Sequence, residues 1–534
     1  MEQRQYKVIF QPQGRTVYAL AGTKIIEAAA IAGIIIDTPC GGEGTCEKCK
    51  VKIVLPKQKA GDCLACQTAI FEDTVIEVPR NSLLTRLDKI AVASDMPAIE
   101  FDDQRLCDKG KCCGVAVDVG TTTIAASLIC VGKKTEIAVA SAMNPQISCG
   151  DDVVSRIKYA ASSDGLSELQ TLIAGKTNEL IETLCRQGGI DREDICEAAV
   201  AGNTVMEHLF CGIDPCLLGH LPFEPVYHGA NERSAAELNI KINDNAKIYM
   251  FPIIGSFIGG DTTAGLLAAD ILNQPQPALF VDIGTNGEIA ILKDGQLTAA
   301  STAAGPAFEG AGIACGMRAA AGAIEKVKFE DDCIYSVIGN TSPTGICGSA
   351  IIDIVAELLN SGIVNSTGRM FEPEEIFETK LPPKIVQRLA KDENGRPYFI
   401  IAKATANNPL VRITQRDVRQ FQLAVGAMRA GINIMLKKAG LKAGDLKRVL
   451  VAGGFGSFIR RNHAQRVGLL PADISHEKIS FIGNSSLAGA KLALLSNKAR
   501  IRAEYLAKQT KHIELSADSD FQNEFAEAMI FPSS

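Results

Sequence analysis

Five cysteines lie close together near the beginning of this 534-residue chain, and their spacing is the first sign of chemistry. Three of them, Cys40, Cys46 and Cys49, stand in the segment PCGGEGTCEKC together with three glycines. Glycine allows turns that other residues avoid, so such a loop can bring backbone N–H groups close to a central object. Four thiolates hold a [2Fe–2S] centre, and three from this loop plus one from a distant strand would supply them. We therefore expect an iron–sulfur cluster, with Cys66 or Cys63 as the fourth ligand.

Zinc is the alternative metal, because the pattern C-x2-C-x13-C-x2-C from Cys46 to Cys66 is close to a zinc-ribbon spacing. Such a site would leave Cys40 and the glycine loop without a role. A ribbon also needs no preceding hairpin and helix, whereas residues 5–20 alternate as two short strands and a helix-like stretch follows Thr23. We favour the cluster over zinc.

The cysteine segment resembles the ferredoxins that have C-x5-C-x2-C spacing. In those proteins the last ligand stands in a Cys-Gln step on a later strand, and here Cys66-Gln67 matches that step. The resemblance implies a [2Fe–2S] cluster held by Cys40, Cys46, Cys49 and Cys66. It covers about the first 80 residues, and we expect the domain to end at the strand 74–78.

Two near-identical segments follow, each an apolar strand that delivers an aspartate, a glycine turn and hydroxyl or amide side chains. They are VAVDVGTTT, ending at Thr123, and LFVDIGTNG, ending at Gly287. Glycine lets the backbone approach phosphate oxygens, Thr and Asn donate hydrogen bonds, and the aspartate at the strand end can hold Mg²⁺, commonly through water. The repetition predicts two phosphate loops. The expected site residues are Asp118, Gly120, Thr121, Thr122 and Thr123 in the first, and Asp282, Gly284, Thr285 and Asn286 in the second.

A third apolar strand, RVLVA, ends in a glycine cluster that contains Gly453, Gly454 and Phe455. A backbone without side chains can lie close to a flat adenine, so we expect these residues to bind the nucleoside. The order of two phosphate loops and an adenosine loop resembles the acetate and sugar kinase, heat-shock chaperone and actin superfamily, which implies two α/β lobes closing on ATP. Asp118 and Asp282 are the expected catalytic carboxylates, and Asp261 and Glu309 are candidates for orienting the attacking water.

These motifs predict an α/β architecture: an N-terminal β-grasp [2Fe–2S] ferredoxin domain followed by a two-lobed, actin-like ATPase. We place the ferredoxin domain at residues 1–80, a connector at 81–113, the first lobe at 114–278 and the second at 279–534. With 46% hydrophobic and 22% charged residues, a net charge of −6 and no long apolar run, neither nucleic acid nor a membrane is an expected partner. The N-terminus lacks a secretory pattern, so we expect a cytoplasmic location.

Further segments sharpen the resemblance, namely residues 144–146, 150–156, 202–208, 306–310 and 413–419. Together with the fused ferredoxin, they resemble the reductive activators of corrinoid proteins. The resemblance implies a cytoplasmic enzyme that uses ATP, Mg²⁺ and the [2Fe–2S] cluster to pass one electron to Co(II), restoring Co(I) for methyl transfer. Its partners would be a corrinoid protein of a methyltransferase system and an upstream electron donor, and a homodimer is left open. Longer members carry a middle domain, and we expect this chain to have only the short connector instead.

Two other functions stay open at this point. One is an ATP-driven electron donor resembling the activators of acyl-CoA dehydratases, which share the ATPase fold but hold a [4Fe–4S] cluster between two subunits. The other is a chaperone-like ATPase in which the cluster only stabilises the fold. Measuring the iron content per chain and testing whether the protein reduces an acceptor would distinguish these two functions from the corrinoid activator.

Overall fold

The computed structural model describes residues 5–12, 14–32, 34, 36, 44, 49–79, 82, 112–317, 319–376, 381–405, 408–453 and 459–533. In this part of the chain no helix is long and apolar enough to cross a membrane.

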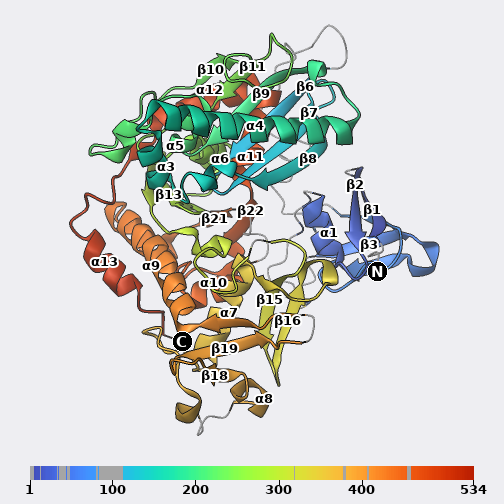
Figure 1. Ribbon diagram of the computed structural model, residues 1–534, viewed down its shortest axis with the longest axis vertical. Coiled ribbons are helices and arrows are strands. Elements are labelled where there is room, and N and C mark those ends of the chain that lie inside the picture. Colours follow the sequence, from blue (N-terminus) through green and yellow to red (C-terminus); the bar gives the residue numbers. More distant parts are fainter. Residues whose placement is uncertain are drawn as a thin grey trace.

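The N-terminal domain is a five-stranded sheet in the order β2-β1-β5-β3-β4, with helix α1 packed on it (Figure 1). Val8, Phe10 and Ile76 are buried between this sheet and α1. The predicted hairpin, helix and last strand are all confirmed. The elements are β1 Gln5–Gln11, β2 Arg15–Leu20, α1 Ile25–Ile31, β3 Lys50–Leu55, β4 Gly61–Leu64 and β5 Thr74–Glu77.

Two six-stranded sheets follow, and five of the six strands have the same arrangement in both. Each has three antiparallel strands joined by hairpins, then two parallel strands beside the first of them. The first sheet has the order β10-β11-β9-β6-β7-β8 and the second β22-β21-β12-β13-β14-β23. Their bounds are β6 Cys113–Val119, β7 Thr123–Cys130, β8 Thr135–Met143, β9 Ile195–Gly202, β10 Asn231–Ser234, β11 Lys247–Met250, β12 Ala278–Ile283, β13 Gly287–Lys293, β14 Gln296–Thr302, β21 Arg448–Ala452, β22 Ile479–Gly483 and β23 Lys511–His512. The repeated motif therefore marks a repeated sheet, as predicted for a two-lobed ATPase.

Helices α6, α11 and α12 lie between the two sheets and share a buried apolar cluster with both. Residues from the first sheet (Ala116, Ala199), the second sheet (Phe280) and α11 (Ala490) are fully buried in this cluster. The segment of α11 and α12 thus returns to the first sheet, and the division into lobes at residue 278 stays a prediction. The helices are α3 Val153–Ala160, α4 Ser163–Gly188, α5 Thr204–Phe210, α6 Gly260–Ala268, α11 Ser485–Leu495 and α12 Asn497–Gln509.

Most of the remaining elements pack on the face of the second sheet that α6, α11 and α12 do not cover (Figure 1). Two small three-stranded sheets have the orders β16-β15-β17 and β18-β19-β20. The elements are β15 Ala323–Phe329, β16 Cys333–Val337, β17 Gly345–Ile346, α7 Gly348–Asn360, α8 Pro383–Val386, β18 Leu389–Lys391, β19 Pro397–Ala402, β20 Val411–Thr414, α9 Gln415–Lys438, α10 Arg461–Arg466 and α13 Phe521–Ala528. Short 3-10 turns include η8 Pro306–Glu309 and η9 Ile338–Asn340.

Candidate functional site

Two cysteine thiols of the N-terminal domain lie together in its core. Cys49 directly precedes β3 and Cys66 follows β4, and their Sγ atoms are 3.1 Å apart. The hydrogen bond from Cys49 is the main cause that lowers the pKa of Cys66 to about 6, and the charge of Lys326 adds a smaller contribution. A lowered thiol pKa favours the thiolate, which is the form that binds iron. The predicted ligands Cys40 and Cys46 fall outside the described residues.

Cys63, the reserve candidate, lies on β4 opposite Val51 and is half-buried. Burial raises the pKa of its thiol, in contrast to Cys66. Among the described residues no three His, Cys, Asp or Glu side chains converge on a common point that could hold a metal. The pairing of Cys49 with Cys66 therefore supports Cys66 as the fourth ligand, which remains a prediction.

A cleft of about 940 Å³ lies between the two six-stranded sheets. Both predicted phosphate loops line it, although they are separated by more than 150 residues in the sequence. All the predicted nucleotide residues within the described part reach this one cleft: Asp118, Gly120, Thr121, Thr122, Thr123, Asp282, Gly284, Thr285, Asn286 and Gly453. Gly454 and Phe455 fall outside the described residues.

The first phosphate loop is a tight turn between β6 and β7. The Gly120 N–H donates to the Thr123 carbonyl at 3.0 Å, and a Cβ on Gly120 would lie 2.6 Å from that oxygen. A side chain at position 120 would force the turn open, which explains the glycine there. Asn144 donates to the Gly120 carbonyl at 2.9 Å, and Asn203 donates to the Thr121 hydroxyl at 2.9 Å.

Arg156 of α3 supports the same loop from behind and is fully buried. Its guanidinium donates to the Thr121 carbonyl at 2.7 Å and to the Gly150 carbonyl at 2.9 Å. Burial lowers its pKa to about 10, so the group stays cationic at neutral pH. A fixed positive charge behind the loop favours an anion in front of it.

The second phosphate loop faces the first across the cleft. The Thr122 and Thr285 hydroxyls are 3.3 Å apart, and the Thr285 hydroxyl also donates to Glu309 Oε1 at 2.5 Å. Glu309, proposed as a water-orienting residue from sequence, therefore lies beside the second loop at the end of η8. Phosphates bound between the two threonines would replace a hydrogen bond that the threonines now share.

Asp118 at the end of β6 is held from the C-terminal part of the chain. Asn484 Nδ2 donates to its Oδ2 at 2.7 Å, and Ser486 Oγ donates to its Oδ1 at 2.8 Å. Asn484 is also the N-cap of α11, where its side-chain oxygen accepts from the Leu487 N–H. Burial raises the pKa of Asp118, and the two hydrogen bonds oppose that rise.

Asp261, Asp282 and Glu288 also line the cleft, and their carboxyl groups lie close enough to affect one another. Burial, together with the neighbouring negative charges, raises the pKa of Asp282 to about 8 and that of Asp261 to about 7. The pKa of Glu288 is raised well above its usual range for the same reasons. The charged forms of these groups repel each other, so a bound cation would stabilise them.

Gly453 ends β21 with a φ of +118°. A Cβ at this position would lie 2.5 Å from the Ile283 carbonyl oxygen, at the end of the strand that carries the second phosphate loop. Both the backbone conformation and the close approach require glycine. The predicted adenosine loop therefore begins directly beside the second phosphate loop.

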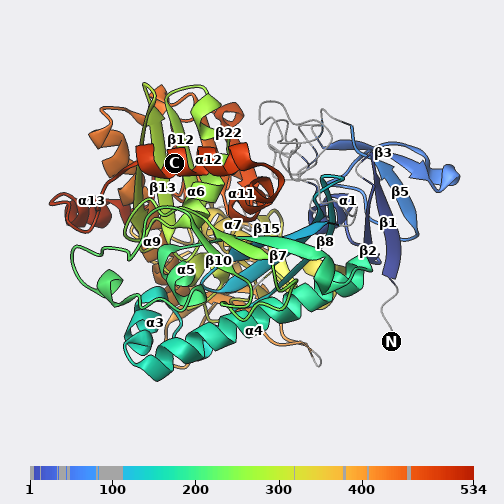
Figure 2. The same ribbon diagram turned by 90° about the horizontal axis from the view of Figure 1, so that it is seen from above.

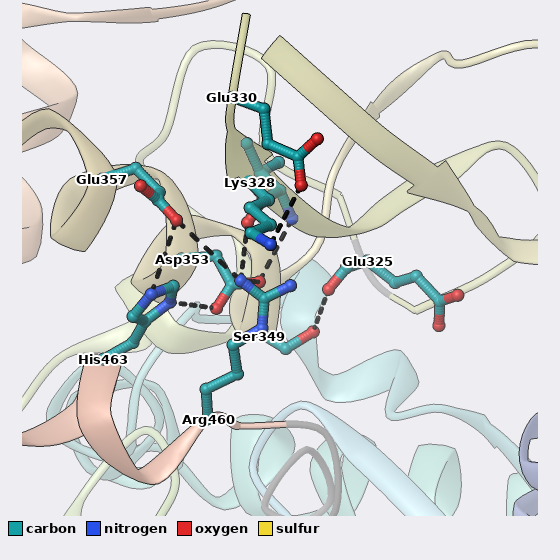
Figure 3. Close-up of polar contacts among 9 residues, drawn as sticks. Glu325, Lys328, Glu330, Ser349, Asp353, Glu357, Arg460 and His463 are labelled. Carbon is teal, nitrogen blue, oxygen red and sulfur yellow. Dashed lines mark hydrogen bonds and ion pairs between the residues drawn. The ribbon is translucent and has the colours of Figure 1, made fainter. Parts of the chain in front are cut away.

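A buried polar network anchors the chain beyond this loop to the cleft wall (Figure 3). His463 Nδ1 lies 2.7 Å from Asp353 Oδ1, and Arg460 donates to the Val327 carbonyl at 3.1 Å. Asp353 accepts from the Val327 N–H at 3.1 Å. On the same helix as Asp353, Ser349 lines the cleft and donates to the Glu325 carbonyl at 2.9 Å. These contacts join α7, β15 and the start of α10 to one another.

Comparisons with known proteins agree with this geometry. Three family models match consecutive parts of the chain: a 2Fe-2S iron-sulfur cluster binding domain at residues 8–70, the RACo middle region at 113–274, and the C-terminal domain of RACo, the ASKHA domain, at 276–534. The corrinoid activation enzyme RamQ of Eubacterium limosum is 31% identical, with 93% of this chain and 94% of that protein covered. The chain belongs to the family of reductive activators of corrinoid proteins.

Two other relatives support this assignment. A [Co(II) methylated amine-specific corrinoid protein] reductase of Methanosarcina barkeri is 28% identical over 77% of this chain and 75% of its own length. A solved reductive activator for a corrinoid, iron-sulfur protein superposes with a TM-score of 0.74 at 32% identity, covering 99% of this chain and 98% of that one. As in that activator, a [2Fe–2S] ferredoxin domain precedes an actin-like ATPase, which supports a cluster and ATP as cofactors.

The expectation that this activator lacks the family's middle domain is wrong. The family's middle-region model matches residues 113–274, the segment predicted to be the first ATPase lobe. This segment forms the sheet that carries the first phosphate loop, so it is half of the nucleotide cleft and not an addition to it. A short connector before residue 113 therefore does not mean that a domain is missing.

Several residues of the cleft were not assigned from the sequence. Asn484 and Ser486 contact Asp118, and Asn203 contacts the first loop. Asn203 and Asn484 both follow a buried strand that ends in glycine, and both cap a helix. A search for a strand, a glycine and an N-cap residue in succession would have found them.

Proposed function

We propose that this activator is an ATP-dependent corrinoid protein reductase that passes one electron from its [2Fe–2S] centre to Co(II), regenerating Co(I) for methyl transfer. The cluster gives up one electron, the cobalt gains it, and an upstream donor reduces the cluster again. When bound, such a cluster supplies one-electron chemistry at low potential. We infer a cytoplasmic location and a corrinoid protein of a methyltransferase system as the partner.

The observation that carries this proposal is the presence of both functional parts in one chain. Cys49 and Cys66 form a thiol pair in the N-terminal sheet, and both phosphate loops face a single cleft in the remainder. Relatives that align with most of the chain are named as a corrinoid activation enzyme, a corrinoid protein reductase and a reductive activator.

Magnesium fits the carboxyl groups of the cleft. Mg²⁺ is usually held by one or two carboxylates together with waters and substrate phosphates. We assign Asp118 and Asp282 as the groups that hold it, because each ends the strand that leads into a phosphate loop. The cation would offset the mutual repulsion that raises the pKa of Asp282.

ATP supplies the free energy for an uphill electron transfer. Co(I) is a strong reductant, and each 100 mV uphill costs about 2.3 kcal/mol for one electron. A ferredoxin centre near about −400 mV falls short by such amounts. A nucleotide can supply this energy only if it binds two conformations with different affinity. Closure of the two sheets on the cleft provides such a pair of conformations.

The test is an anaerobic absorbance measurement on a purified Co(II) corrinoid protein mixed with this reduced activator, with and without Mg-ATP. Growth of the Co(I) spectrum only with Mg-ATP is the expected result. Hydrolysis of ATP without cobalt reduction would overturn the reductase function and leave an ATPase with another electron acceptor.

A further inference from the structure

A buried ion cluster joins the ferredoxin domain to the first six-stranded sheet. Arg15 Nη1 on β2 lies 3.2 Å from Glu136 Oε1 on β8, with side chains only 13% and 9% exposed. Lys491 of α11 binds the other oxygen of Glu136, which also accepts from the Ser127 hydroxyl at 2.9 Å. Figures 1 and 2 both show β2 beside β8. Ion pairs withdrawn from water in this way are more specific and less screened than surface pairs.

The same strand of the ferredoxin domain also contacts the other half of the protein. Strand β2 packs against η9, and Ile338 of η9 lines the nucleotide cleft. Strand β15, which pairs with the strand that leads into η9, carries Glu325 at the cleft and next to it Lys326, whose charge acts on Cys66. The ferredoxin domain therefore lies across both halves of the ATPase, with the Cys66 side near β15.

Helix α11 connects the ion cluster to the nucleotide cleft. Asn484 and Ser486 at its start hold both oxygens of Asp118, and Lys491 on the same helix holds Glu136. Asn484 and Lys491 are seven residues apart, about two helical turns, and so lie on the same face. A cation bound at Asp118 would therefore share both carboxylate oxygens with the residues that position α11 and, through this helix, Lys491.

We propose that docking of the ferredoxin domain through Arg15, Glu136 and Lys491 competes with nucleotide binding, so that Mg-nucleotide releases the domain from the cleft face. Docking contacts both halves, so it favours the arrangement of the halves in this structure. Release frees the Cys66 side of the domain from β15 for an approach to the partner's cobalt. This inference rests on one part of the proposed function, the binding of Mg-nucleotide in the cleft, and does not depend on cobalt reduction.

Hydrogen–deuterium exchange on the full-length protein tests the proposal, with Mg²⁺ and a non-hydrolysable ATP analogue as the probe. In the wild type, we expect the analogue to speed amide exchange about fivefold or more in β2 and β8, because allosteric coupling is commonly at least that large. Arg15→Gln and Glu136→Gln should show the faster exchange without the analogue. By reciprocity, both variants should bind the analogue about fivefold more tightly.

Lys7→Gln is the matched control, because Lys7 is an exposed cation on the neighbouring strand β1. It should exchange like the wild type, and an unchanged visible cluster spectrum confirms that the variants are folded. Unchanged exchange in β2 and β8 on saturation with the analogue, or greater protection, would overturn the proposal. The assay contains no corrinoid protein, so a failure to reduce cobalt would count against the proposed function and not against the docking.

Discussion

The side-chain amide of Asn484 donates a 2.7 Å hydrogen bond to Asp118, a residue 366 positions earlier in the chain. The contact joins the start of α11 to the end of β6, and it fixes the carboxylate that we assign to the metal–nucleotide complex. The catalytic cleft of this activator is therefore assembled from both ends of the ATPase part.

The first prediction concerns this carboxylate. Asp118→Asn keeps the size of the side chain and removes its negative charge, so the metal–nucleotide complex loses a ligand or an oriented water. We expect ATP-driven cobalt reduction to fall by about 10- to 100-fold or more, as for other groups that orient metal ligands. The cluster spectrum should not change. Asp244→Asn, an exposed position on the same half of the protein, is the control and should keep wild-type activity. An unaltered reduction rate in Asp118→Asn would contradict the assignment.

The second prediction separates the two candidates for the fourth cluster ligand. Cys66 lies 3.1 Å from Cys49 and has a lowered thiol pKa, whereas burial raises the pKa of Cys63. A [2Fe–2S] centre gives about two iron atoms per chain. We expect Cys66→Ser to lose most of the iron and the visible absorbance, and Cys63→Ser to retain both. Iron analysis after anaerobic purification measures this, and the opposite result would move the ligand to Cys63.

The third prediction concerns the pH dependence of stability. The folded protein raises the pKa of Asp282 from 3.8 to about 8, mainly by burial and by the charges of Asp261 and Asp118. Between these two values the folded state binds more protons than the unfolded state. Stability therefore decreases as the pH rises through that window, according to the linkage relation. Mg-nucleotide should reduce the effect, because it stabilises the charged form.

Thermal unfolding from pH 5 to pH 8 without nucleotide measures this contribution. The melting temperature of Asp282→Asn should fall less steeply with pH than that of the wild type. Asp244→Asn again provides the control and should follow the wild-type curve, because its side chain is exposed. Equal slopes for Asp282→Asn and wild type would show that Asp282 is already ionised in the folded protein.

The fourth prediction concerns the buried guanidinium behind the first phosphate loop. Arg156→Met leaves the carbonyls of Thr121 and Gly150 without their donor. Each unsatisfied buried group costs about 1–3 kcal/mol, so the free energy of unfolding should fall by a few kcal/mol. Nucleotide affinity should fall as well, since the loop loses its support and its positive charge.

Denaturant unfolding and nucleotide titration measure the two effects in the same preparation. Arg186→Met is the control, because Arg186 lies on the exposed face of α4 and makes a 3.7 Å ion pair with the exposed Glu182. Its unfolding free energy should stay within about 0.5 kcal/mol of the wild type. A similar loss in both variants would mean that Arg156 has no special role.

The sequence predicted those parts of the site that lie within one local segment. Asp118 and Asp282 could be predicted as site residues because each lies at the end of a buried strand and precedes a glycine turn. This pattern depends only on neighbouring residues in the sequence. The two halves of the cleft were predicted from the repetition of that pattern. The arrangement of five strands that the two sheets share confirms the expected architecture.

The sequence could not show contacts that depend on how the chain returns to an earlier sheet. Asn484 and Ser486 come from a helix near the end of the chain, and only the packing of α11 on the first sheet brings them to Asp118. Asp261 was one of two guesses for a water-orienting group, and its place beside Asp118 and Asp282 became visible only in the folded cleft. From the sequence alone, the family's middle domain was wrongly expected to be missing. This expectation relied on the short connector, but the length of a connector does not show which segment forms a lobe.

The most direct test of the central claim is a single-turnover reaction followed by anaerobic stopped-flow absorbance. Reduced activator is mixed with a Co(II) corrinoid protein and Mg-ATP in the absence of any other reductant. We predict that the cluster is oxidised and Co(I) forms at the same rate and in a ratio of about one to one, because a [2Fe–2S] centre carries one electron. Formation of Co(I) without oxidation of the cluster, or at the same rate without ATP, would contradict the account.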